Sequence, residues 1–123
     1  MRILIIDDEI EIRKMVCRML TEEGHDVIDA ADGKEGLAIF YKQPFDLVIT
    51  DIIMPEKEGI ETIRELKMNF PKTKILAISG GGKIDPVDCL KMAKMIGADL
   101  TLKKPFIKLE LMKSVNELLR LKK

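Results

Sequence analysis

Short apolar runs alternate with longer amphipathic segments along this chain, and the alternation is typical of repeated strand-helix units. The apolar runs predict five strands, at Ile3–Ile6, Val27–Ala30, Leu47–Thr50, Ile75–Ile78 and Leu100–Leu102. The three runs expected to be inner strands are continuously apolar, as in a parallel sheet covered on both faces. We therefore predict an α/β fold of five strand-helix units around one parallel sheet.

The segments between and after these runs carry helical signals. Apolar residues recur at three-and-four spacing from Ile12 to Leu20, and Gly24 then marks the end of a first helix. Four further helices are predicted: from Asp32-Gly33 to before Pro44, from Pro55 to about Asn69, from Asp85-Pro86 to Gly97, and along the stripe Leu111–Leu119.

Length and charge narrow the classes of protein to consider. The chain has 123 residues, of which 46% are hydrophobic, and this fits one compact domain over residues 1–123. Basic and acidic residues number 21 each, so no overall field favours nucleic acid or a membrane surface. The apolar start is far shorter than a signal peptide or a membrane span, and we expect a cytoplasmic protein.

The two cysteines lie in separate helical segments and suggest no redox or zinc chemistry. Cys17 and Cys89 form no Cys-x-x-Cys motif and have no paired histidine. Both are expected to be reduced helix residues. His25 follows Gly24 in a turn before the second strand, where a solvated turn residue is expected and not a phosphorelay histidine.

Polar residues follow four of the five predicted strands. Asp7-Asp8-Glu9 follows the first, Asp51 the third, Ser79 the fourth, and Lys103-Lys104 the fifth. Each of them alone is more often a cap, a turn residue or a solvated charge. Parallel strands, however, bring their carboxyl ends to one edge of the sheet, where ligands bind.

Three carboxylates at one edge would repel one another and raise each other's pKa unless cations lie among them. Oxygen ligands without histidine or cysteine favour Mg²⁺ or Mn²⁺, and a lysine can supply a further positive charge. Such a site suits phosphoryl transfer: one carboxylate acts as nucleophile, while the metal, a lysine and a hydroxyl bind the transferred oxygens.

These residues resemble the receiver domain of bacterial response regulators. The resemblance covers nearly the whole chain, and its motifs are Asp7-Asp8, Asp51 to Gly59 with Met54-Pro55 inside, Ser79, and Lys104-Pro105-Phe106. It implies a doubly wound, flavodoxin-like (βα)5 fold with strand order 2-1-3-4-5. It also implies a phosphorylation-dependent signalling switch of a two-component system, which catalyses only its own phosphorylation and dephosphorylation.

The resemblance assigns roles to single residues. It implies that Asp51 accepts the phosphoryl group, assisted by Lys104 rather than Lys103, and that Ser79 is the switch hydroxyl. It further implies Mg²⁺ as cofactor, bound by Asp8, Asp51 and the backbone carbonyl of Ile53, with Asp7 assisting through water. Pro105 is similar to the family's cis proline.

The resemblance also implies partners. The phosphoryl donor is expected to be a sensor histidine kinase, a phosphotransfer protein or a small phosphodonor, and the output a protein target, without direct contact to nucleic acid or membrane. The chain is either a stand-alone regulator or part of a longer one.

Two departures from the family pattern bear on the switch. Thr101 stands where the family commonly has an aromatic residue, so a rotating ring is not expected there. Gly80-Gly81-Gly82 follows Ser79, which predicts a loop of high backbone freedom.

The same fold can serve three other functions. An FMN site would need a Gly, Ser or Thr cradle where Asp7-Asp8-Glu9 stands. An aspartyl phosphatase would need a second acid at position 53, which is isoleucine. A receiver that is never phosphorylated is disfavoured because the set of acidic, hydroxyl and lysine residues is complete.

Overall fold

Five parallel strands form one sheet in the order β2-β1-β3-β4-β5. The computed structural model describes residues 1–52, 58–79, 91, 94–95 and 97–121. The strands are β1 (Arg2–Ile6), β2 (Asp26–Ala30), β3 (Leu47–Asp51), β4 (Lys74–Ser79) and β5 (Leu100–Lys103). Each contains its predicted run and extends it by one residue or two, which confirms the predicted strands and their order.

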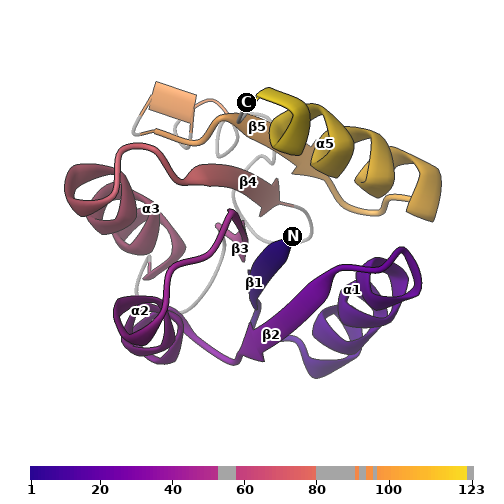
Figure 1. Cartoon of the computed structure of the whole chain (residues 1–123), viewed down its shortest axis with the longest axis horizontal. Helices are drawn as coiled ribbons and strands as arrows, with labels where there is room; N and C mark the ends of the chain where they lie inside the picture. The colour runs from indigo at the N-terminus through magenta and orange to yellow at the C-terminus, as the bar shows by residue number, and fades with distance from the viewer. Residues whose placement is uncertain (53–57, 80–90, 92–93, 96, 122–123) are drawn as a thin grey trace.

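Two pairs of helices cover the two faces of this sheet (Figure 1). α1 (Ile10–Glu22) and α5 (Lys108–Leu121) lie on one face, and α2 (Gly33–Lys42) and α3 (Glu58–Asn69) on the other. The doubly wound arrangement predicted from the sequence is thereby confirmed. Pro55 and most of the segment from Asp85 to Gly97, where the sequence predicts a helix start and a further helix, lie outside the described residues.

Side-chain alternation on the strands creates two hydrophobic cores. On β1, Ile3 and Ile5 pack with α1 and α5, while Leu4 and Ile6 pack with α2 and α3, because successive side chains of a strand point to opposite faces. All four are nearly fully buried. A strand that is apolar at every position therefore serves both cores, as the sequence pattern predicts.

Local signals set where two helices begin and end. The Asp32 side chain accepts a hydrogen bond of 2.8 Å from the backbone N–H of Glu35, and it thereby caps the start of α2. Gly24 has φ +88° and follows the end of α1, a conformation that favours glycine. Both boundaries agree with the sequence-based prediction.

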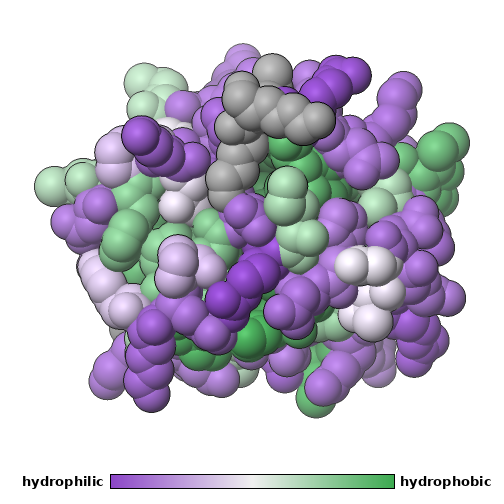
Figure 2. All heavy atoms as spheres, viewed as in Figure 1, coloured by the Kyte–Doolittle hydropathy of each residue, from purple (hydrophilic) through white to green (hydrophobic). Residues whose placement is uncertain are grey.

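Hydrophilic residues cover most of the face seen in Figure 2, with smaller hydrophobic patches between them. Among the described helices, none combines the length and the apolar character that crossing a membrane requires.

The core on the α2 and α3 face offers a matched test of packing. Leu66 of α3 is fully buried, whereas Met68, two residues later on the same helix, is 75% exposed. We predict that Leu66→Ala lowers the free energy of unfolding by about 2–5 kcal/mol, because it leaves a cavity. Met68→Ala should change it by less than about 0.5 kcal/mol. Urea denaturation measures both, and equal losses would contradict the described burial.

Candidate functional site

The carboxyl edge of the sheet is held in register by backbone hydrogen bonds beyond the strand ends. The N–H of Asp7 donates to the carbonyl of Ala30 at 3.2 Å, and that of Lys104 donates to the carbonyl of Ser79 at 2.8 Å. The N–H of Ile52 donates to the carbonyl of Ile78 at 2.9 Å. The residues in these bonds come from the ends of all five strands, which lie side by side along one edge of the sheet, as the sequence predicts.

Three carboxyl groups meet at this edge. Carboxylate oxygens of Asp7, Asp8 and Asp51 all lie within 4.8 Å of one another. Asp7 and Asp51 are each only 3% exposed, whereas Asp8 is exposed. The strongest repulsion is therefore expected between the two buried groups, since solvent screens a charge at Asp8.

The ammonium group of Lys104 lies between the buried carboxylates. Its Nζ is 3.3 Å from Oδ2 of Asp7 and 3.3 Å from Oδ2 of Asp51, and the side chain is only 11% exposed. Lys103, its neighbour, is exposed. The peptide bond from Lys104 to Pro105 is cis, which confirms the prediction for this proline.

Burial and charge act in opposite directions on these groups. Burial raises the pKa of the Asp7 carboxyl, and the N–H of Glu9 and the charge of Lys104 offset this only in part. Burial alone would lower the pKa of Lys104, but the carboxylates of Asp51 and Asp7 raise it above its usual value. Lys104 is therefore charged at neutral pH, while ionised Asp7 remains costly to bury.

Glu9 is a member of the site that the sequence-based interpretation missed. Its Oε1 lies 3.2 Å from Nζ of Lys104, although its side chain is 59% exposed as expected for a first-turn acid. Glu9 is also the N-cap residue of α1, so its position follows from that of Asp7. The adjacent acidic residues Asp7-Asp8-Glu9 were the available signal, but the pairing with Lys104 required the strand order.

Ser79 ends β4 at this edge and is fully buried. Its Oγ makes no hydrogen bond within the described part of the chain. A buried hydroxyl without a partner carries a desolvation cost, so a ligand oxygen placed here would gain a donor. Ile53 and Gly80–Gly82, which the sequence also implicates, lie outside the described residues.

The donor set fits a hard divalent cation. Asp7, Asp8 and Asp51 offer carboxylate oxygens alone, which are the ligands that Mg²⁺ takes when water and a phosphate complete its shell. A dication here would also relieve the repulsion that Lys104 offsets only in part. These three residues could therefore hold Mg²⁺ at the mouth of the site.

Gly59 packs against the backbone that follows Asp51. A Cβ at Gly59 would meet the carbonyl oxygen of Asp51, and would lie 2.6 Å from the carbonyl oxygen of Ile52 and 2.7 Å from its Cα. Glycine is therefore required for α3 to approach the end of β3 this closely. At Gly36 of α2, by contrast, a Cβ would meet the side chain of Ile6.

Two residues for which the sequence predicts no functional role lie away from this edge. His25 stands just before β2, at the opposite edge, but it is half-buried rather than solvated, and burial lowers its pKa. Cys17 is a free cysteine in α1, as expected, and burial raises the pKa of its thiol to about 11, which disfavours the reactive thiolate. Cys89 lies outside the described residues.

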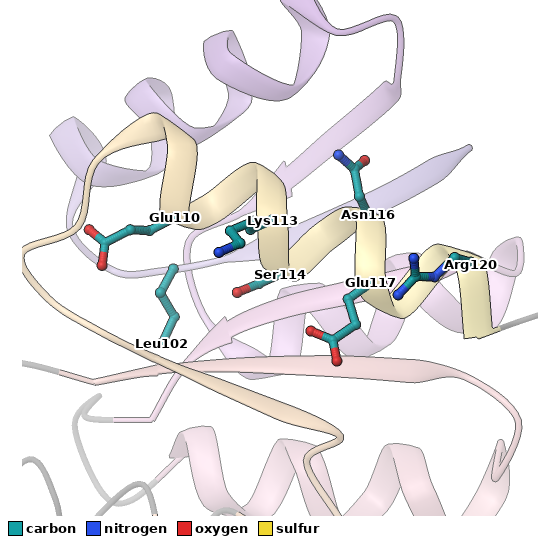
Figure 3. A pocket seen from close by; sticks show the side chains of 7 residues that line it. All are labelled: Leu102, Glu110, Lys113, Ser114, Asn116, Glu117 and Arg120. Atoms are coloured by element: carbon teal, nitrogen blue, oxygen red, sulfur yellow. The ribbon is translucent and has the colours of Figure 1, made fainter.

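A hollow of about 630 Å³ lies elsewhere, along α5 (Figure 3). It is lined by Leu102 of β5 and by residues of α5: Glu110, Lys113, Ser114, Asn116, Glu117 and Arg120. It shares no residue with the acidic cluster. Its lining contains both acidic and basic side chains. The carboxylates that could bind a metal lie at the edge of the sheet and not in this hollow.

Comparison with known proteins gives consistent results for family and fold. The family model of the response regulator receiver domain matches residues 3–116. Transcriptional regulatory protein CpxR of Escherichia coli (strain K12) is 34% identical over 119 residues, which are 97% of this chain and 49% of that protein. Probable transcriptional regulator ycf27 of Cyanophora paradoxa is 35% identical over 97% of this chain and 48% of its own length. The chain thus spans about half the length of these curated relatives.

Solved structures of similar proteins have the same fold. The receiver domain of NtrX from Brucella abortus matches with a TM-score of 0.89 at 30% identity, over 96% of this chain and 98% of that one. A CheY-like response regulator receiver domain protein from Methanospirillum hungatei JF-1 matches with a TM-score of 0.89 at 30% identity, over 98% of this chain and 94% of that one.

Because the pKa of Asp7 is raised, replacing this carboxyl group with a neutral amide should increase the stability of the fold in a pH-dependent way. The pKa of Asp7 in the folded protein lies above 3.8, so folding favours the protonated carboxyl group. The stability that this group contributes is fully present below pH 3.8 and is lost as the pH rises through the folded-state pKa. We expect metal-free Asp7→Asn to melt a few degrees above the wild type at neutral pH, with no difference below pH 3.8. Thermal melts across pH in a chelator test this, with Asp26→Asn, whose side chain is 72% exposed, as control. A lower melting temperature for Asp7→Asn at pH 7 would refute it.

Because Gly59 lies so close to the backbone after Asp51, adding one methyl group there should lower the free energy of unfolding. Gly59→Ala must displace backbone, and overpacking of this kind costs about 1–3 kcal/mol. Gly36→Ala should cost less, because the added methyl group meets the side chain of Ile6, which can shift more readily than the backbone atoms that face Gly59. Denaturant unfolding of both variants gives the comparison, and a Gly59→Ala protein as stable as the wild type would overturn it.

Proposed function

This chain belongs to the family of response regulator receiver domains, and on that basis we propose that it is a Mg²⁺-dependent switch that accepts a phosphoryl group on Asp51. Receiver domains are signalling modules of two-component systems and not enzymes that turn over a separate substrate. The finer assignment rests on one observation: the nucleophile candidate Asp51 is buried at the sheet edge with Nζ of Lys104 3.3 Å from its carboxylate.

In the proposed step an oxygen of the Asp51 carboxylate attacks the phosphorus of the donor. The new P–O bond forms as the bond between phosphorus and the leaving group breaks, and the leaving group departs with that electron pair, as acetate when acetyl phosphate is the donor. Asp51 reacts as the carboxylate, so no proton has to be removed first. Attack of water on phosphorus later releases inorganic phosphate and restores the carboxylate.

The neighbouring residues would stabilise the transferred group. Lys104 keeps its charge because of the carboxylates around it, and can pair with a phosphoryl oxygen. The buried Oγ of Ser79 can donate its hydrogen to another oxygen. Mg²⁺, when bound by Asp7, Asp8 and Asp51, would supply further positive charge for the developing transition state. The backbone carbonyl of Ile53 completes the proposed ligand set.

The donor and the output are inferred from the family. We expect phosphoryl transfer from a phosphohistidine of a sensor kinase or of a phosphotransfer protein. The downstream target is expected to be a protein that recognises the phosphorylated form. The matched relatives are described as transcriptional regulators, and this chain matches about half of their length. With Thr101 on β5, the response is proposed to centre on the segment after Ser79 rather than on a rotating ring.

Phosphorylation of Asp51 is testable with a small donor. Incubation with acetyl phosphate and Mg²⁺ should add one acid-stable, base-labile phosphate by mass, because the product is an acyl phosphate. Asp51→Asn should remain unlabelled. Asp26→Asn, which also removes one carboxylate but at the opposite edge, should be labelled as the wild type is. Full labelling of Asp51→Asn would contradict the proposal. Labelling of the wild type in the absence of any divalent metal would contradict it as well.

A further inference from the structure

Arg13 of α1 contacts β2 and the residue that follows β1, beside the acidic cluster but without touching the carboxylates of that cluster. From α1, its Nε donates to Oδ2 of Asp29 on β2 at 2.7 Å, and its Nη1 donates to the backbone carbonyl of Asp7 at 2.8 Å. The Arg13 side chain is only 12% exposed. Both hydrogen bonds have short distances for charged donors, so the guanidinium is fixed in one orientation.

The carbonyl that Arg13 binds belongs to the peptide group between Asp7 and Asp8. Fixing this oxygen fixes the plane of that peptide and hence the direction in which the next residue leaves. The N–H of Asp7 donates to the carbonyl of Ala30, its Oδ1 accepts from the N–H of Glu9 at 2.9 Å, and its Oδ2 faces Lys104. Arg13 therefore satisfies the remaining polar group of Asp7.

Asp29 has a separate part in this arrangement. Its carboxylate pairs with Nε and leaves Nη1 directed at the carbonyl of Asp7, so the planar group is held on two sides. It also neutralises the charge of Arg13, so that the pair adds little net field to the neighbouring site. A lysine could form one such bond but could not maintain both directions.

We propose that Arg13 is a positioning residue, held by Asp29, that orients the turn from Asp7 to Asp8 for binding of a divalent cation. The proposal rests on the proposed function, because it concerns the same metal site. It adds that binding depends on an arginine which is not a ligand and which contacts the backbone carbonyl of Asp7 rather than the carboxylates of the cluster.

Charge effects and positioning predict opposite results for one substitution. Removing the positive charge of Arg13 reduces repulsion of a dication, so electrostatics alone would strengthen Mg²⁺ binding. Loss of positioning would weaken it. Substitution of a group that orients a metal ligand typically reduces affinity about 10- to 100-fold.

The experiment is a Mg²⁺ titration of the whole chain followed by amide chemical shifts, with the dissociation constant as readout. We expect Arg13→Gln and Arg13→Lys each to weaken binding by about tenfold or more. In the metal-free proteins the amide signal of Asp8 should also move. Lys14→Gln and Lys14→Arg are the matched controls, because Lys14 is exposed on the same helix, and they should bind nearly as the wild type does. Ile63→Val lowers stability from the opposite face and should leave the dissociation constant unchanged.

Each outcome decides one question. Unchanged or tighter binding by Arg13→Lys would overturn the positioning role while leaving the proposed function intact. Failure of the wild type itself to bind Mg²⁺ would overturn the proposed metal site and this inference with it. If Arg13→Gln does not fold, Arg13→Lys, which keeps the charge, carries the test. Weaker binding by Ile63→Val to the same degree would show that lost stability, not orientation, is the cause.

Discussion

The ammonium group of Lys104 lies 3.3 Å from a carboxylate oxygen of Asp7 and 3.3 Å from one of Asp51. These three side chains come from the ends of three different strands. Two carboxylates this close together and almost wholly buried would repel strongly without a cation between them. One lysine faces both of them and Glu9 as well. Burial raises the pKa of Asp7, and Lys104 offsets this only in part. Lys104 therefore allows these carboxylates to lie together in the folded protein, but the site still carries more negative than positive charge.

The parallel sheet makes this arrangement possible, and the sequence predicts most of it. Runs such as Ile3–Ile6 and Ile75–Ile78 are apolar at every position because helices cover both faces, and this pattern is visible without coordinates. The observed strands are slightly longer, since polar residues such as Lys74 and Asp51 still pair through their backbone. Hydrophobicity cannot show those ends, because backbone hydrogen bonds do not depend on side-chain type.

The sequence predicts less well which side chains contact one another within the site. Asp7, Asp51 and Lys104 stand at strand ends, so a rule about parallel sheets predicts that they meet. Glu9 is the N-cap of α1 and Arg13 is the fourth residue of that helix, and an exposed charge is the ordinary expectation at both positions. Their contacts depend on the angle at which α1 leaves β1 and on the position of β2 beside it. Such details are set by packing of the whole domain and not by local sequence.

The raised pKa of Asp7 and the buried hydroxyl of Ser79 connect stability to the proposed function. Asp7 is costly to ionise, and Oγ of Ser79 is buried without a partner within the described residues. A core optimised only for stability would replace both groups. Under the proposed function they have a reason to remain, because a cation would lower the cost of the first and a phosphoryl oxygen would give the second its hydrogen bond. Phosphorylation would then be favoured by costs already present in the unmodified protein. The Arg13–Asp29 pair contributes by keeping the acidic turn oriented while those costs are unrelieved.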